Sequence, residues 1–121
     1  MLHLGDIVIV KGLLDPRGRN PKNRPAVVVT PSEELATGGP IFVVAITTSL
    51  PETLPDDYVL LPWSRPRHPR TGLNEPNAAV CHWLVTVEAD RIFRIIGRAP
   101  ASHLGRMLAE LKRLYEDPDP A

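Results

Sequence analysis

Two stretches, Arg24–Val29 (RPAVVV) and Ala45–Ser49 (AITTS), decide the fold that this sequence predicts. Each contains an apolar run that is too short for a helix, which indicates a buried strand. Each run also ends in a polar group, the guanidinium of Arg24 in the first and the hydroxyl of Thr47 in the second. If the fold brings these two strand ends together, the two groups would form a small phosphate-binding corner.

Other apolar runs continue this pattern, and proline-rich loops separate them. Proline makes up 14 of the 121 residues, well above the average share of about 5%. Strands are expected at Gly5–Lys11, Ala26–Thr30, Ile41–Thr48, Tyr58–Trp63, Ala78–Trp83 and Ile92–Arg98, and loops at Leu13–Asn23, Pro31–Pro40 and Pro51–Asp57. Several runs are apolar at consecutive positions, so both of their faces need cover. A small antiparallel barrel with a helix or a partner subunit against its outside would provide it.

Only the last segment has the pattern of a helix. Its apolar residues recur at spacings of three and four and form one stripe: Leu104, Met107, Leu108, Leu111, Leu114 and Tyr115. Ser102 is the expected N-cap, and Pro118 prevents the helix from continuing. The stripe predicts packing against the sheet. We therefore expect one domain over residues 1–116 and a short acidic tail over 117–121.

Charge is balanced over the whole chain but not locally. Lys and Arg together number 14, as do Asp and Glu, so net charge does not indicate a polyanionic partner. Two loops are nevertheless basic: Lys11–Arg24, the first basic loop, contains one acid, and Arg65–Arg70, the second basic loop, contains none. These loops either form an electropositive groove or are ordinary solvated loops.

Several classes of protein and site are disfavoured. A single cysteine excludes an intrachain disulfide and a Cys-rich metal site. The sequence has no signal peptide and no run of about 18 apolar residues, so we expect a soluble cytoplasmic protein without a membrane segment. Cys81 and His82 are adjacent on a predicted strand and point to opposite faces, so they cannot form a catalytic pair. Cys81 is expected in the core, whereas His82 is either a packed or surface residue or a catalyst.

The order of segments resembles the MazF/PemK family, the endoribonuclease toxins of type II toxin–antitoxin systems. The resemblance covers about residues 4 to 115 and rests on Gly5-Asp6-Ile7-Val8, Asp15-Pro16, Arg24–Val29, Ala45-Ile46-Thr47, Gly72–Asn77, Val80-Cys81-His82-Trp83 and the closing helix. It implies an α+β, mainly β fold: a small SH3-like antiparallel barrel with a C-terminal helix, usually a homodimer.

The resemblance also implies an activity and its partners. Family members cut single-stranded mRNA at short sequences by attack of the ribose 2′-hydroxyl, without a metal or another cofactor. A cognate antitoxin, whose acidic and disordered segment folds onto the RNA groove, keeps them silent.

The family's active-site Arg and Thr match Arg24 and Thr47, and Thr48 or Ser49 is placed to assist. PemK-type members have a carboxylate where this chain has His82 and an Arg where it has Val80. An imidazole can transfer a proton near neutral pH, so His82 either keeps the role of the carboxylate or marks a weakened site. The expected RNA contacts are Thr48, beside Thr47, and six cations of the basic loops: Arg17, Arg19, Lys22, Arg65, Arg67 and Arg70.

Two other functions remain open at this point. One is a non-catalytic inhibitor on the same architecture, like the related CcdB toxins that bind DNA gyrase. The pair of Arg24 and Thr47 argues against it, because an inhibitor needs no phosphate-binding corner. The other is a degenerate RNA-binding homologue that has lost cleavage, which the absence of an Arg at Val80 favours.

Overall fold

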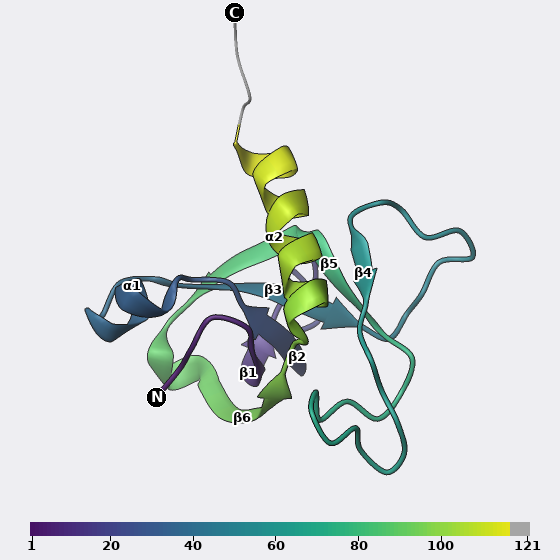
Figure 1. Cartoon of the computed structure of the whole chain (residues 1–121), viewed down its shortest axis with the longest axis horizontal. Helices are drawn as coiled ribbons and strands as arrows, with labels where there is room; N and C mark the ends of the chain where they lie inside the picture. Colours follow the sequence, from purple (N-terminus) through teal and green to yellow (C-terminus); the bar gives the residue numbers. More distant parts are fainter. Residues whose placement is uncertain (117–121) are drawn as a thin grey trace, which may run out of the picture.

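The computed structural model describes residues 1–116, which fold into a six-stranded antiparallel sheet crossed by one long helix (Figure 1). The elements are β1 (Asp6–Leu13), β2 (Lys22–Val28), α1 (Ser32–Ala36), β3 (Ile41–Thr47), β4 (Tyr58–Leu60), β5 (Ala78–Val87), the 3₁₀ turn η1 (Ala89–Arg91), β6 (Ile92–Arg98) and α2 (Ala101–Tyr115). The strand order is β4-β5-β3-β2-β1-β6. This confirms the mainly β fold with a C-terminal helix, although the sheet does not close. The expected acidic tail at 117–121 lies outside the described residues.

A strand is present in each of the six expected places, but only β6 has the expected bounds, and the largest shifts are in β2 and β5. β2 begins at Lys22, inside the stretch expected to be a loop, because Leu13 of β1 pairs with Lys22 and Val10 pairs with Arg24. β5 runs on to Val87 because β3 pairs with it along its length. Pairing thus extends β2 into Lys22–Pro25, which have little strand preference, whereas the added part of β5, Leu84–Val87, contains the strand formers Val and Thr.

The helices differ from the prediction in two details. The expected N-cap at Ser102 is wrong: α2 already begins at Ala101, and Pro100 holds the N-cap position without a side-chain hydrogen bond. Ser102 Oγ instead lies 3.3 Å from His103 Nδ1. The short helix α1 was not expected, because a five-residue helix is too short to show an apolar period.

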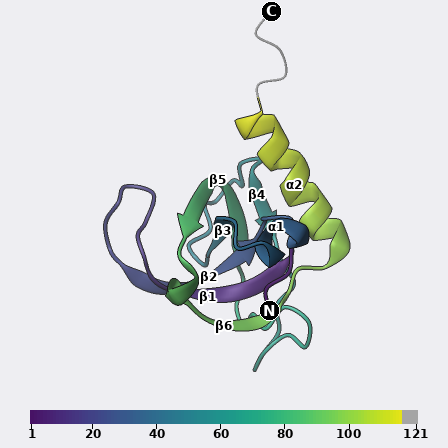
Figure 2. The same ribbon diagram turned by 90° about the vertical axis from the view of Figure 1, so that its left-hand side faces the viewer.

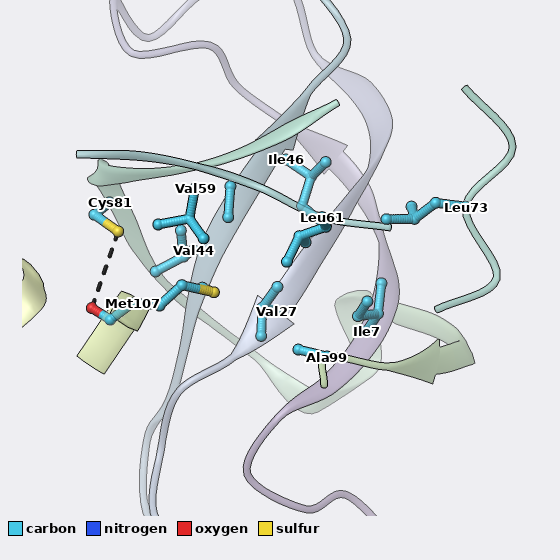
Figure 3. Close-up of a cluster of buried hydrophobic side chains, with 11 residues drawn as sticks. Ile7, Val27, Val44, Ile46, Val59, Leu61, Leu73, Cys81, Ala99 and Met107 are labelled. Atoms are coloured by element: carbon cyan, nitrogen blue, oxygen red, sulfur yellow. Dashed lines mark hydrogen bonds between the residues drawn. The ribbon is translucent and has the colours of Figure 1, made fainter. Parts of the chain in front are cut away.

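The sheet has a buried layer on each face, which explains why its strands are apolar at consecutive positions. The first layer lies under α2 and includes the completely buried Met107 (Figure 3). The second layer lies on the opposite face and includes Trp83. Along β2, Val27 belongs to the first layer and Val28 to the second. Leu104, Met107 and Leu111 of the apolar stripe of α2 thus pack on the core as predicted. The end of the stripe does not, since Leu114 and Tyr115 are exposed.

Cys81 is a core residue, also as predicted. It is completely buried in the first layer, and its sulfur lies 4.0 Å from the carbonyl oxygen of Met107. Burial raises the pKa of this thiol to about 11. Within residues 1–116, no helix has both the length and the apolar character needed to span a membrane.

Two glycines permit the end of the second basic loop and the residues just after it to lie close against β6. Gly72 has a φ of +75° and lies so close to β6 that a Cβ there would be 2.2 Å from the carbonyl oxygen of Ile96. At Gly97, a Cβ would be 2.3 Å from the backbone of Thr71. Only glycine permits two chain segments to approach this closely. The first basic loop, in contrast, extends beyond the sheet between β1 and β2 (Figure 2).

Candidate functional site

A groove of about 710 Å³ lies where β2, β3 and β6 meet the second basic loop. Arg24 and Thr47 both line it, together with Thr48 and Ser49. The polar residues that end the two opening stretches, Arg24 and Thr47, thus line one concave surface.

Strand register explains why these two residues meet. β2 and β3 are antiparallel, with Ala26 opposite Ala45 and Val28 opposite Val43. Arg24 and Thr47 each lie two residues beyond the pair of Ala26 and Ala45, so both strands leave the ladder at the groove. Side chains at alternate positions of a strand share a face, which relates Arg24 to Ala26 and Thr47 to Ala45.

The guanidinium of Arg24 is held from three directions. Nε donates to the carbonyl oxygen of Leu13 at 2.9 Å, and Nη2 donates to that of Asn20 at 2.7 Å. The central carbon of the guanidinium lies 5.2 Å from the ring centre of Trp83. No carboxylate among residues 1–116 forms an ion pair with Arg24. Its positive charge is therefore available to an anionic ligand.

Thr47 is the last residue of β3 and lines the groove. Its Oγ1 accepts a hydrogen bond from the backbone N–H of Ser49 at 3.0 Å. A hydroxyl can accept and donate at the same time, so the proton of Thr47 remains free for a ligand oxygen.

The groove is rich in positive charge. Four of its lining residues are cationic and one is acidic: Lys22, Arg24, Arg67 and Arg94 against Glu75. Sequence reasoning placed three of the four cations but missed Arg94. That residue comes from β6, where it pairs with Ile9. A single Arg inside the apolar run of β6 is the signal that could have identified it.

The other predicted RNA contacts lie outside the lining of the groove. Arg17 and Arg19 are exposed on the first basic loop, where their backbone N–H groups donate to Asp15 Oδ1 at 3.0 and 2.9 Å. The backbone hydrogen bond from Arg19 contributes most to holding the pKa of Asp15 below its ordinary value. The side-chain amide of Asn20 and the backbone N–H of Arg17 act in the same direction. Arg65 lies over the ring of Trp63 at 6.0 Å.

The backbone of Arg70, the last of these contacts, ties its loop to β6. Its carbonyl oxygen accepts from the N–H of Arg98 at 2.8 Å. Thr48, by contrast, does line the groove.

His82 does not line this groove. It lies on a second cavity of about 460 Å³, between β5 and the first basic loop. Its Nδ1 forms a short hydrogen bond with Oδ2 of Asp57, and the same oxygen accepts from its backbone N–H at 3.3 Å. The carboxylate of Asp57, which was not among the predicted site residues, thus orients the ring, and Nε2 has no hydrogen-bond partner within residues 1–116.

One more polar side chain underlies the groove. Asn77 is 2% exposed, and its Nδ2 donates to the carbonyl oxygens of Leu61 at 3.3 Å and Glu75 at 3.1 Å. Its Oδ1 has no partner among the described residues. Over the same range, no three His, Cys, Asp or Glu side chains lie close enough together to hold a metal ion.

Comparison with solved structures gives several similar folds at low sequence identity. The MazF toxin of Deinococcus radiodurans (Form-I crystal structure) aligns with a TM-score of 0.70 at 19% identity, over 93% of this chain and 94% of that one. The Mycobacterium tuberculosis toxin MazF-mt6 aligns with a TM-score of 0.67 at 20% identity, over 92% and 96%. An endoribonuclease from a mycobacterial species, in complex with its cognate antitoxin, aligns with a TM-score of 0.68 at 15% identity, over 99% and 100%.

Comparison with curated proteins returns no match. The sequence profile of the PemK-like, MazF-like toxins of type II toxin–antitoxin systems, however, matches residues 3–115, nearly the full length of the sheet and α2. The chain therefore belongs to the PemK-like, MazF-like family of type II toxins.

Proposed function

We propose that this toxin is an endoribonuclease that cleaves single-stranded mRNA in the cytoplasm, at short sequences and without a metal ion. The observation that carries the proposal is that Arg24 and Thr47 line the same groove, together with the cations Lys22, Arg67 and Arg94. In phosphoryl transfer the negative charge collects on the phosphate oxygens, and a fixed guanidinium can bind two of them.

The roles follow from the contacts of each group. Arg24 stabilises the charge that develops on the phosphate as the ribose 2′-hydroxyl attacks. Thr47 donates its free proton to a phosphate oxygen or orients the attacking hydroxyl. Lys22, Arg67 and Arg94 bind the neighbouring phosphates along the groove. The products expected from this attack are a cyclic phosphate and a free 5′-hydroxyl.

His82 has a conditional place in this scheme. Its imidazole, oriented by Asp57, has the arrangement of a general acid or base. It lies on the second cavity, so proton transfer by His82 requires an RNA chain that continues from the groove to that cavity. If His82→Ala keeps the wild-type dependence of cleavage rate on pH, His82 has no part in the chemistry.

The cognate antitoxin is the second partner that we propose. One structural neighbour was solved in complex with its antitoxin. The cations of the groove and the exposed Arg17 and Arg19 suit an acidic peptide that competes with RNA. Rising salt should weaken this binding, and charge reversal at Arg67 and Arg70 should weaken RNA and antitoxin binding together. If it weakens only RNA binding, the antitoxin binds elsewhere.

The test is cleavage of a long RNA by the purified protein in EDTA, with the cut ends mapped. Arg24→Ala and Thr47→Val should fold normally, and Arg24→Ala should lose about 10²-fold or more of the rate. Arg106→Ala is the control, because Arg106 is an exposed cation on α2, away from the groove. Wild-type rates in Arg24→Ala would refute the assignment.

One observation favours a second candidate, an RNA-binding homologue that has lost cleavage. Val80, where PemK-type relatives have an Arg, is buried in the second layer and offers no functional group. RNA binding without cut ends in the same experiment would support this candidate. Inhibition of DNA gyrase without RNA binding would instead support a CcdB-like inhibitor.

A further inference from the structure

The environment of Arg24 determines which of its hydrogen-bond donors can reach a ligand. A guanidinium has five N–H groups. Two of them, on Nε and Nη2, donate to the carbonyl oxygens of Leu13 and Asn20. Both N–H groups of Nη1 and one of Nη2 remain. The two terminal nitrogens can therefore still donate side by side, which is the geometry that binds two oxygens of one phosphate.

The two carbonyl oxygens are themselves well fixed. Leu13 ends β1, where it pairs with Lys22 of β2. Asn20 is held in a left-handed conformation, with a φ of 52°, and its side-chain amide donates to Asp15 Oδ2 at 2.8 Å. These contacts define the position of the guanidinium within its own plane, but two hydrogen bonds on one edge still permit it to tilt.

Trp83 occupies the place from which this tilt can be limited. Its ring centre lies 5.2 Å from the central carbon of the guanidinium, within the range of a cation–π contact. Trp83 is 8% exposed and belongs to the second buried layer, so its own position is set by the core. Trp83 lines the second cavity and not the groove, so its contact with the groove runs through Arg24.

We propose that Trp83 is a positioning residue, which holds the guanidinium of Arg24 with its two terminal nitrogens directed into the groove. This inference rests on the proposed function, because it assumes that Arg24 acts on a phosphate. It also predicts that lysine cannot replace Arg24, since an ammonium group lacks the planar fork that the two carbonyl oxygens and the ring hold.

The test is a double-mutant cycle on RNA cleavage with Trp83→Leu, Trp83→Phe and Arg24→Ala. Trp83→Leu should lower kcat by about tenfold with little change in KM, the size of a partly desolvated cation–π contact. Trp83→Phe keeps an aromatic face and should retain most of the rate. In the Arg24→Ala background, Trp83→Leu should have no further effect, because its partner is already absent.

Two readouts separate positioning from a general structural role. In NMR spectra, the Arg24 Nε–H should exchange with water faster in Trp83→Leu than in the wild type, while the thermal unfolding of both is monitored. Trp63→Leu is the matched control for this measurement, because it removes the cation–π contact with Arg65 instead; it should leave the exchange of the Arg24 Nε–H unchanged.

The results that overturn the proposal are distinct from those that overturn the function. Wild-type kcat in Trp83→Leu, or an equal loss with and without Arg24, would show that Trp83 does not act through Arg24. If Trp83→Leu fails to fold, Trp83→Met takes its place, because it is apolar, adaptable in packing and has no aromatic face; an equal loss with and without Arg24 would refute the inference. Normal cleavage by Arg24→Ala would instead refute the endoribonuclease assignment itself.

Discussion

Replacing Gly97 by alanine should destabilise the fold through the contact between β6 and the second basic loop. The new Cβ would lie 2.3 Å from both the carbonyl carbon and the carbonyl oxygen of Thr71, and 2.4 Å from the carbonyl oxygen of Arg70. All three are backbone atoms, so no side-chain rotation can relieve the overlap. The loop must therefore move away from the strand.

The size of the effect follows from what this movement removes. Overpacking in a well-packed region costs about 1–3 kcal/mol. Separation of the segments also breaks the 2.8 Å hydrogen bond from the N–H of Arg98 to the carbonyl of Arg70, which is worth about 1 kcal/mol. The free energy of unfolding should therefore fall by about 2–4 kcal/mol in Gly97→Ala. At roughly 4 °C per kcal/mol, Tm should fall by about 8–16 °C.

The measurement is urea and thermal unfolding of Gly97→Ala beside Gly105→Ala. Gly105 lies in α2, and a Cβ there would meet nothing within 4 Å. The control should therefore gain about 0.5–1 kcal/mol from better helix propensity. If the Tm of Gly97→Ala lies within roughly 2 °C of the wild-type Tm, the close contact between the loop and β6 does not stabilise the protein.

Three further predictions concern other parts of the molecule. Arg94→Ala should weaken RNA binding and lower the slope of log K against log salt by about 0.7, whereas the same measurement on Arg106→Ala should show no change. Cys81, whose burial raises its pKa to about 11, should resist iodoacetamide at pH 8 until urea unfolds the chain; rapid modification of the native protein would contradict this. Phe93 and Ile95 are 61% and 44% exposed on edge strand β6, so sedimentation at micromolar concentration should show a homodimer rather than a monomer.

The opening stretches predicted the fold and the centre of the groove because strand pairing acts on local patterns. Once β2 and β3 pair as antiparallel neighbours, their register places Arg24 and Thr47 together. The burial of Cys81 followed in the same way from a continuous apolar run. These features depend on short-range periodicity, which a sequence displays directly.

Features that depend on distant contacts were not predictable in this way. Arg94 reaches the groove only because β6 pairs with β1, which comes from the opposite end of the chain. Asp57 orients His82 across 25 residues of sequence, and nothing in the local pattern marks either residue as a partner. His82 lies with Trp83 on the second cavity and not on the groove, and the spacing of residues along the chain does not reveal this.

The two buried layers of the sheet have a consequence for how this sequence can change over time. Val27 and Val28 are neighbours in the chain, yet one packs under α2 and the other on the opposite face. Substitutions at the two positions should combine additively, whereas changes at Val27 and Met107, which share a layer, should show epistasis. The first layer is nevertheless tied to the groove, because two of its members, Ile46 and Leu73, also line it. Changes beneath α2 can therefore reach the surface that Arg24 and Thr47 line.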